Sequence, residues 1–276
     1  MSGSLDAHVH LWNRRTDPQP WIDPATMAAI DRDFAPGDLE RMLDSTGIQA
    51  AVVVQSSNSA AETRRLLAHP SPRIAGVVGW IDLTGDVAAQ VDALDPAARA
   101  RLVGIRHLVH IDPDPGWLSR PEVATGLKGL AARGLGFDLV VRSWQLPSAA
   151  AVVSAHPEVR FVVDHLGGIA ETGDTAGWEA GLRELAARPN AYAKISGLAG
   201  MPRDGDRAGL RRVVGVALEA FGPQRLMYGS DWPLAELGAG AVAWRGAVEE
   251  LIGQLAVPER QAIWSGTASA FYRIGA

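Results

Sequence analysis

The first residues alternate between apolar and polar side chains, a pattern that is typical of a β-strand. Residues 5–12 read Leu-Asp-Ala-His-Val-His-Leu-Trp. Because side chains two positions apart share one face of a strand, we expect Asp6, His8 and His10 to lie on the same face. Imidazole is a common metal ligand and a general base near neutral pH. The simpler alternative is an edge strand that carries two histidines without a function, and partners elsewhere in the chain must decide between the two.

The rest of the chain repeats one pattern, a short apolar run followed by an amphipathic segment. The apolar runs predict strands at residues 5–12, 49–55, 74–82, 102–108, 136–142, 159–165, 191–196 and 225–231. The segments between them predict helices at residues 37–46, 58–69, 85–94, 121–133, 147–156, 175–188, 206–221 and 240–255, with an extra helix at 258–271. Residues 13–36 are rich in proline and aspartate turns and predict a long loop of the kind that often forms a lid or a binding loop.

Strict alternation of strands and helices predicts parallel strands joined by right-handed helical crossovers. Eight such units in 276 residues match the size of a closed (β/α)8 barrel, the TIM barrel. A doubly wound open sheet is the competing fold, but it often carries a glycine-rich phosphate loop after its first strand, and this chain has none there. No linker rich in glycine, proline or serine divides the sequence. We therefore predict one TIM-barrel domain over residues 1–276 with an extra C-terminal helix.

Composition narrows the classes of function. Hydrophobic residues make up 47% of the chain, and the net charge of −5 without a basic run argues against nucleic acid or an anionic membrane as a partner. The absence of cysteine excludes disulfides, thiolate zinc sites and a cysteine nucleophile. The first residues do not fit a signal peptide and no apolar run has the length of a membrane span, so we expect a cytoplasmic protein. The oligomeric state stays open.

Polar or ionisable side chains stand at or just after the end of almost every predicted strand. In a TIM barrel these ends meet at one rim, where active sites lie. The residues concerned are His8, His10, Gln55, Trp80, Asp82, Arg106, His110, Arg142, Asp164, His165, Lys194, Ser196 and Asp231. Charged groups at a barrel mouth lose hydration without helping the fold, so their convergence indicates a functional site. It predicts that His8 and Asp231 lie within roughly 10 Å of each other.

Each of these residues also has a purely structural alternative. Asp231 is a favoured residue type for capping a helix, and Lys194 can extend to solvent. Arg106 can form a salt bridge at the mouth, and His165 can be a hydrogen-bonded turn residue. The chain contains no Gly-x-Ser-x-Gly elbow, phosphate-binding loop or His-Glu-x-x-His helix. A site of histidine and aspartate that activates water is the chemistry that remains.

The ordered set of motifs resembles the amidohydrolase superfamily, and within it the branch that hydrolyses sugar lactones such as L-fuconolactone. The likeness extends over essentially the whole chain. It rests on Asp6-Ala7-His8-Val9-His10-Leu11-Trp12, Val103-Gly104-Ile105-Arg106-His107, residues 112–121, Phe137-Asp138-Leu139 with Gln145-Leu146-Pro147, Asp164-His165-Leu166-Gly167-Gly168, Lys194-Ile195-Ser196-Gly197-Leu198 and Gly229-Ser230-Asp231-Trp232-Pro233. The resemblance implies a (β/α)8 barrel that opens a cyclic ester.

The resemblance also implies roles for particular residues. His8, His10, His165 and Asp231 would form the catalytic centre and hold one divalent metal ion, zinc before others. Arg106 would face the substrate. Some lactonases of this branch resemble metal enzymes and yet work without metal, so both forms of catalysis stay open.

Two positions depart from the pattern of this branch. Gly168 stands where a basic residue is common, and His110 stands where glutamine is usual. Both departures leave open which sugar lactone, and which ring size, is the substrate. Because the superfamily also contains metal-dependent decarboxylases of aromatic acids, a decarboxylase of an aromatic or unsaturated acid is the alternative enzyme. A barrel that binds sugar acids without catalysis is the third hypothesis.

Lactone hydrolysis assigns a task to each group at the mouth. Asp231 is the candidate base that takes a proton from water and returns it to the leaving ring oxygen. The developing oxyanion needs donors or a cation placed beforehand, which His10, His165, Arg106 or a metal would supply. We expect substrate contacts from Trp12, Gln55, His110, Trp117, Arg142, Lys194 and Trp232. Trp117 belongs to residues 111–120, a loop that we expect to cover the mouth.

Overall fold

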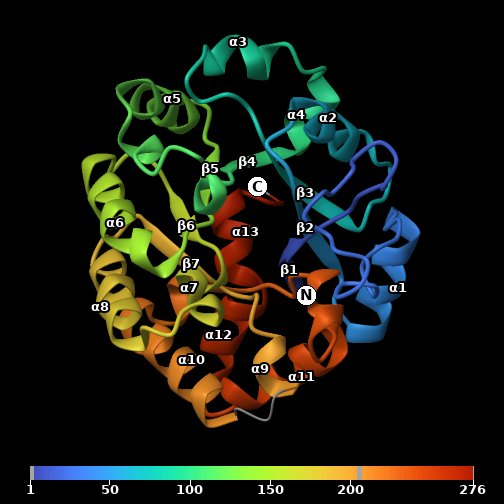
Figure 1. Cartoon of the computed structure of the whole chain (residues 1–276), viewed down its shortest axis with the longest axis vertical. Helices are drawn as coiled ribbons and strands as arrows, with labels where there is room; N and C mark the ends of the chain where they lie inside the picture. The colour runs from blue at the N-terminus through green and yellow to red at the C-terminus, as the bar shows by residue number, and fades with distance from the viewer. Residues whose placement is uncertain (1–2, 204–206, 276) are drawn as a thin grey trace.

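Eight parallel strands, hydrogen-bonded in sequential order, form the centre of the molecule (Figure 1). The computed structural model describes residues 3–203 and 207–275. The strands are β1 (Leu5–Val9), β2 (Ala50–Val54), β3 (Ile74–Gly79), β4 (Leu102–His107), β5 (Gly136–Leu139), β6 (Phe161–Val163), β7 (Ala191–Ile195) and β8 (Leu226–Tyr228). A parallel bridge between Val9 and Trp232 joins the two ends of the sheet. The predicted (β/α)8 barrel is therefore confirmed, although most strands are shorter than predicted.

Helices surround the strands and cover the outer face of the barrel (Figure 1). They are α1 (Pro36–Thr46), α2 (Ala60–Ala68), α3 (Val87–Asp92), α4 (Pro96–Arg101), α5 (Pro121–Ala132), α6 (Leu146–Ala155), α7 (His165–Gly168), α8 (Thr175–Ala186), α9 (Gly200–Arg203), α10 (Arg207–Phe221), α11 (Ala241–Leu251), α12 (Val257–Gln261) and α13 (Thr267–Tyr272). In α10 the buried residues include Leu210, Val213, Val214, Ala217 and Phe221, the spacing of one helix face. Within the described residues, no helix has the length and apolar character of a membrane span.

The short helices α4, α7 and α9 were not predicted from the sequence pattern. The predicted start of α10 at residue 206 lies outside the described residues. The extra C-terminal helix is present as α12, a π-helical turn at Ala262–Gly266 and α13. It is therefore one interrupted helical segment rather than a single regular helix.

The first strand contains a bulge that separates Asp6 from the two histidines. From Asp6 to Val9, β1 advances three residues while β2 advances only two. Ala7 therefore packs with the apolar residues inside the barrel. The carboxylate of Asp6 instead accepts hydrogen bonds from the backbone N–H groups of His8 (3.0 Å) and Ser230 (2.9 Å). The expectation that Asp6 shares a face with the histidines is wrong, and its role is to tie β1 to the segment after β8.

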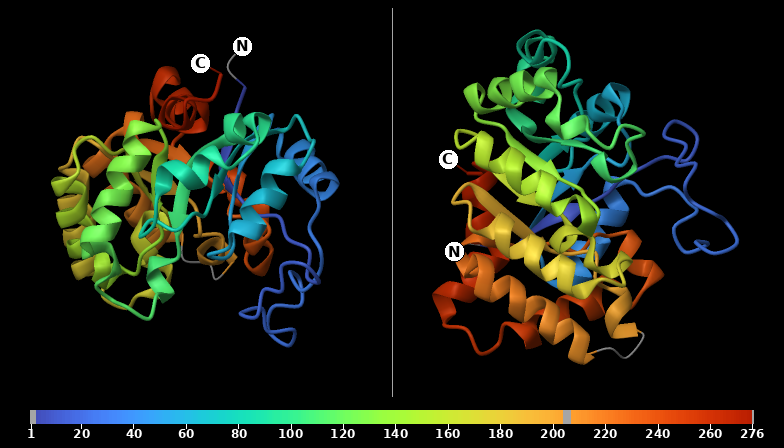
Figure 2. Two further views of the ribbon diagram at one scale, coloured as in Figure 1. Left: turned by 90° about the horizontal axis from the view of Figure 1, so that it is seen from above. Right: turned by 60° about the vertical axis from the view of Figure 1, so that its left-hand side comes forward.

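The two ends of the barrel are closed in different ways. At one end, Ala268, Phe271 and Tyr272 of α13 pack against apolar residues inside the barrel. The loop of residues 13–35 lies at the opposite end, away from both termini (Figure 2). This loop has no helix, as predicted, but a bridge between Trp12 and Phe34 closes it and Ile30 is fully buried. The loop is therefore anchored to the barrel at its two ends and at Ile30.

Packing between Gly136 and α13 is tight enough to test by adding one methyl group. A Cβ atom on Gly136 would lie 2.6 Å from the ring of Phe271. We expect Gly136→Ala to lower the free energy of unfolding by about 1–3 kcal/mol, as overpacked cores do. Gly215→Ala in α10 is the control, because a Cβ there meets open space and should raise stability by up to about 1 kcal/mol. Urea denaturation of both variants measures the difference, and equal stabilities would contradict the packing of α13 described above.

Candidate active site

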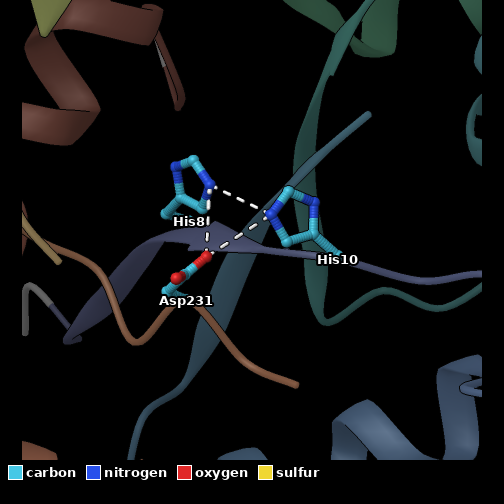
Figure 3. A group of neighbouring side chains, drawn as sticks. All are labelled: His8, His10 and Asp231. Carbon is cyan, nitrogen blue, oxygen red and sulfur yellow. Dashed lines mark hydrogen bonds and ion pairs between the residues drawn. The ribbon is translucent and has the colours of Figure 1, made fainter. Parts of the chain in front are cut away.

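Three imidazoles and one carboxylate converge at the end of the barrel opposite α13. The Nε2 atoms of His8, His10 and His165 lie 3.7, 3.5 and 3.9 Å from Oδ1 of Asp231. Figure 3 shows His8 and His10 with their rings turned toward the Asp231 carboxylate. The prediction that His8 and Asp231 meet at one rim is confirmed, because β1 and the segment after β8 are neighbours where the barrel closes.

Hydrogen bonds from the second ring nitrogen orient two of these histidines. Nδ1 of His10 donates to the carbonyl oxygen of Val54 at 2.8 Å, which leaves the lone pair of Nε2 facing the centre. Nδ1 of His165 lies 2.9 Å from the hydroxyl oxygen of Ser196. Such partners behind the ring fix its orientation and its tautomer.

The backbone at His165 and Asp231 adopts a conformation that residues other than glycine rarely adopt. Their φ angles are 53° and 59°, both in the left-handed region. The 3-10 turn Leu234–Leu237 starts after Pro233 and receives no side-chain cap. The helix-capping interpretation of Asp231 is therefore wrong. Backbone strain of this kind is often found at functional sites, where the surrounding structure holds it in place.

A fully buried ion-pair network lies directly behind His8. The ammonium of Lys194 lies 2.5 Å from Oδ2 of Asp138, 2.9 Å from Oδ1 of Asp164 and 3.0 Å from Nδ1 of His8. The hydroxyl of Tyr272, from α13, donates to Oδ2 of Asp138 at 2.7 Å. Lys194 is therefore enclosed by the protein and supports His8 from behind.

Arg106 connects this network to the mouth of the barrel. Its Nη1 donates to Oδ2 of Asp164 at 2.9 Å and lies 3.3 Å from Nε2 of His8. Its Nη2 donates to the backbone carbonyl of Gln55, whose side-chain amide donates in return to the carbonyl of Arg106 at 3.0 Å. The guanidinium is thus held in one position, and Gln55 holds it there.

Burial and neighbouring charges set the protonation states at the centre. Burial and the nearby Lys194 ammonium hold the pKa of His8 well below its usual value, and burial also lowers the pKa of His165. Burial opposes ionisation of Asp231, but the surrounding histidines outweigh it and keep its pKa below the ordinary range. At neutral pH His8 and His165 are therefore uncharged and the Asp231 carboxylate is ionised, which is the state that metal ligands need.

The donor set fits a divalent metal ion. Oδ1 of Asp231 is buried and has no hydrogen-bond partner among the described residues, although three imidazole nitrogens surround it. For His8 to ligate through Nε2 its proton must sit on Nδ1, and Oδ1 of Asp164, which also pairs with the Lys194 ammonium at 2.9 Å, lies 3.4 Å away to accept it. His8, His10 and Asp231 offer ligand atoms close enough together to hold one ion, and Nε2 of His165 lies 3.9 Å from Oδ1 of Asp231 beside them.

A cavity of about 440 Å³ opens over this centre. Its walls include six residues that the sequence had indicated, namely His10, Arg106, His110, Arg142, His165 and Asp231. Burial, with Arg106 and Arg142 nearby, lowers the pKa of His110 to about 4, so this side chain is neutral near pH 7. Gly168 also lines the cavity, and a Cβ there would lie 2.9 Å from the carbonyl oxygen of Val141. A larger residue at position 168 would need the backbone to move.

The remaining residues that were expected to bind substrate lie behind the cavity walls formed by the described residues. Trp12 stacks on His10 with ring centroids 6.4 Å apart, and Trp232 packs edge-to-face on Phe34 at 5.1 Å. Trp117 is buried and stacks on His107 at 3.7 Å. Gln55 and Lys194 are fully buried, as described above. The structure thus assigns these five side chains to support, because packing or hydrogen bonding already occupies them.

Sequence reasoning missed three residues that the structure brings into the site. Asp138 had a usable signal, since it is a charged residue between Phe137 and Leu139 in an apolar strand. Tyr272 had none, because an aromatic residue near the end of a helix is ordinary. Trp21, which lines the cavity from the long loop, resembled any other loop residue.

Two buried tyrosines test whether the contact between Tyr272 and Asp138 supports the fold. Tyr272→Phe removes a donor from a buried carboxylate, so we expect unfolding to become easier by about 1–3 kcal/mol. Tyr228→Phe is the matched control, because the Tyr228 hydroxyl is buried and finds no hydrogen-bond partner in the described part of the chain. Its loss should leave stability equal or higher. Chemical denaturation of the two variants compares them, and equal losses would reject the contribution of the Tyr272 hydroxyl.

Comparisons with known proteins agree with this geometry. L-fucono-1,5-lactonase from Burkholderia ambifaria is 36% identical over 289 aligned residues, which cover 99% of this chain and 97% of that protein. L-fucono-1,5-lactonase from Burkholderia multivorans is 35% identical, with coverage of 98% and 96%. A crystal structure of an amidohydrolase from Burkholderia multivorans with bound zinc has a TM-score of 0.91 and 35% identity, covering 98% of this chain and 99% of that one. Because the sequence profile of the family described as Amidohydrolase also matches residues 5–274, the chain belongs to the amidohydrolase family.

Proposed function

We propose that this protein hydrolyses a sugar lactone, an aldonolactone similar to L-fuconolactone, to the corresponding sugar acid. The observation that carries the proposal is Oδ1 of the ionised Asp231 carboxylate, which has no hydrogen-bond partner among the described residues and lies on the wall of a cavity that also presents Arg106 and three imidazoles. Two relatives that match almost the whole chain are L-fucono-1,5-lactonases. A neutral cyclic ester fits a cavity of this size with few charged groups.

Asp231 has the position of a general base in this reaction. Its Oδ1 is an open acceptor for a proton from water that attacks the lactone carbonyl. The bond between the carbonyl carbon and the ring oxygen then breaks, and Asp231 returns the proton to that oxygen as it becomes a hydroxyl. A divalent ion held by His8, His10, His165 and Asp231 would add Lewis-acid polarisation of the carbonyl and would make water more acidic.

Arg106 has the position of the group that stabilises negative charge on the carbonyl oxygen. Its guanidinium is fixed by Asp164 and by the Gln55 carbonyl before any substrate arrives. A cation held in advance stabilises a developing oxyanion without reorganisation during the reaction. Arg106 also attracts the carboxylate of the product, so release of the sugar acid must overcome this attraction.

A panel of sugar lactones that includes L-fucono-1,5-lactone, assayed with a pH indicator, tests the proposed function. Opening a lactone to an acid releases a proton at neutral pH, so we expect acidification with at least one panel member. Carbon dioxide release from an aromatic acid, with no lactone consumed, would instead establish the decarboxylase. Binding of sugar acids without turnover of any lactone would establish the non-catalytic alternative.

Replacing Asp231 by asparagine tests the general base. The amide keeps the size of the carboxylate but not its basicity, so we expect kcat to fall by about 10²–10⁴, or roughly 3–5 kcal/mol. Lactone binding should survive. The control is Asp174→Asn, because Asp174 caps α8 on the surface and asparagine caps a helix equally well. Zinc content by plasma mass spectrometry shows whether Asp231 is also a ligand, and a wild-type rate in Asp231→Asn would refute the mechanism.

Arg106→Met tests the fixed cation. Methionine preserves part of the apolar stem, and Asp164 keeps Lys194 as a partner. We expect kcat/KM for the active lactone to fall at least about tenfold, which corresponds to ~1.4 kcal/mol of transition-state stabilisation. Circular dichroism provides the check on folding. A folded variant with unchanged kcat/KM would remove Arg106 from the reaction.

A further inference from the structure

Trp21 stands out among the aromatic residues of the loop 13–35, because it lines the cavity and keeps 40% of its surface exposed. We propose that Trp21 is a substrate-contacting residue that determines specificity: the face of its indole is the wall against which the ring of the lactone lies. This inference rests on the proposed function and adds a residue to it. The loop that carries Trp21 is the long segment that follows β1, at the end of the barrel away from both termini (Figure 2).

The indole of Trp21 is held by a chain of hydrogen bonds that leads into the barrel. Its Nε1–H donates to Oε1 of Gln19 at 2.9 Å, and Nε2 of Gln19 donates to the hydroxyl of Ser56 at 2.8 Å. Gln19 is only 1% exposed, although it belongs to a surface loop. Burial of a polar side chain costs free energy unless its polar atoms are hydrogen-bonded. The Gln19 amide meets this condition through its bonds to Ser56 and Trp21, and these bonds orient the indole.

The inner end of this chain is a fully buried carboxylate. Glu62, in the first turn of α2, accepts hydrogen bonds from the backbone N–H and hydroxyl of Ser56 at 2.8 and 2.5 Å. It accepts the same pair of bonds from Ser57 at 2.8 and 2.6 Å. Four donors at a helix N-terminus satisfy a buried carboxylate well, and two of them hold Ser56 in place. Ser56 in turn positions the Gln19 amide, and that amide positions the indole of Trp21.

This use of the indole N–H limits what Trp21 can offer a ligand. Because its only donor is bonded to Gln19, Trp21 presents a π face and apolar edges to the cavity. An aromatic face suits a ring that exposes C–H groups, as one side of a sugar lactone does. Trp21 also packs edge-to-face on Trp12 at 6.0 Å, and Trp12 stacks on His10. Through Trp12, which lies behind the cavity wall, ring contacts therefore connect Trp21 to His10 of the reaction centre.

Steady-state kinetics on a lactone that wild-type enzyme hydrolyses test the proposal. We expect Trp21→Ala to raise KM about tenfold and to change kcat by less than about twofold, the pattern of a contact equally strong in ground state and transition state. Trp21→Phe should recover most of the affinity, since it keeps an aromatic face. Gln19→Leu should raise KM severalfold, because it frees the indole without touching the ligand. Trp144→Ala is the control, as Trp144 is 66% exposed and lies outside the cavity walls formed by the described residues.

The outcomes separate this inference from the proposed function. If wild-type enzyme hydrolyses a lactone and Trp21→Ala keeps its KM, the role of Trp21 is refuted and the function stands. An effect of Trp144→Ala as large as that of Trp21→Ala would also refute it. If wild-type enzyme hydrolyses no lactone, the function fails, and calorimetric titration with L-fuconate then decides. Weaker binding to Trp21→Ala than to wild type supports the contact, and equal or absent binding overturns it.

Discussion

The buried ammonium of Lys194 is the constraint on which the rest of this site depends. Removing charges from water costs several kcal/mol per ion, so a lysine with no exposed surface requires compensation on every side. Asp138 and Asp164 provide it, and Arg106 balances the second carboxylate. Burial still raises the pKa of Asp138 to about 6, despite the Lys194 ammonium beside it. Two anions and two cations thus form a neutral group, and its members hold His8 and the guanidinium in place.

The two ends of the barrel have different physical tasks. At the floor, the end of the barrel that α13 closes, this helix packs apolar side chains into the barrel, and its Tyr272 hydroxyl donates a hydrogen bond to Asp138. At the rim, His165 and Asp231 hold left-handed backbone conformations, and three imidazoles lie close to one carboxylate. Groups of this kind do not stabilise a protein without a bound cation or substrate. The packed floor and the buried ion pairs are what allow the rim to keep this arrangement.

The sequence was sufficient for the fold and for the centre of the site, because both depend on periodic features. Strand and helix periods repeat along the chain, and the ends of parallel strands meet at one rim, so His8 and Asp231 could be placed together. The bulge between Asp6 and Val9 interrupts the alternation of side chains along β1. Asp6 therefore lies on the other face of the strand from His8, against the prediction. Whether Trp117 or Trp21 faces the cavity depends on tertiary contacts such as the stacking on His107, which leave no mark on local sequence. The same holds for Lys194, whose strand position is compatible with either solvent or burial.

The hydrogen bond between Tyr272 and Asp138 has a consequence for how the protein is made. His8 is synthesised before the other residues of the centre, and Tyr272 follows only after all eight strands have been translated. A nascent chain that lacks α13 leaves the floor of the barrel open, so water can reach Asp138 and Lys194 and weaken the pairing that orients His8. The hydrogen bond from Tyr272 to this network can therefore form only after α13 has been synthesised. Loss of α13 by proteolysis or premature termination would act on catalysis from the far side of the molecule.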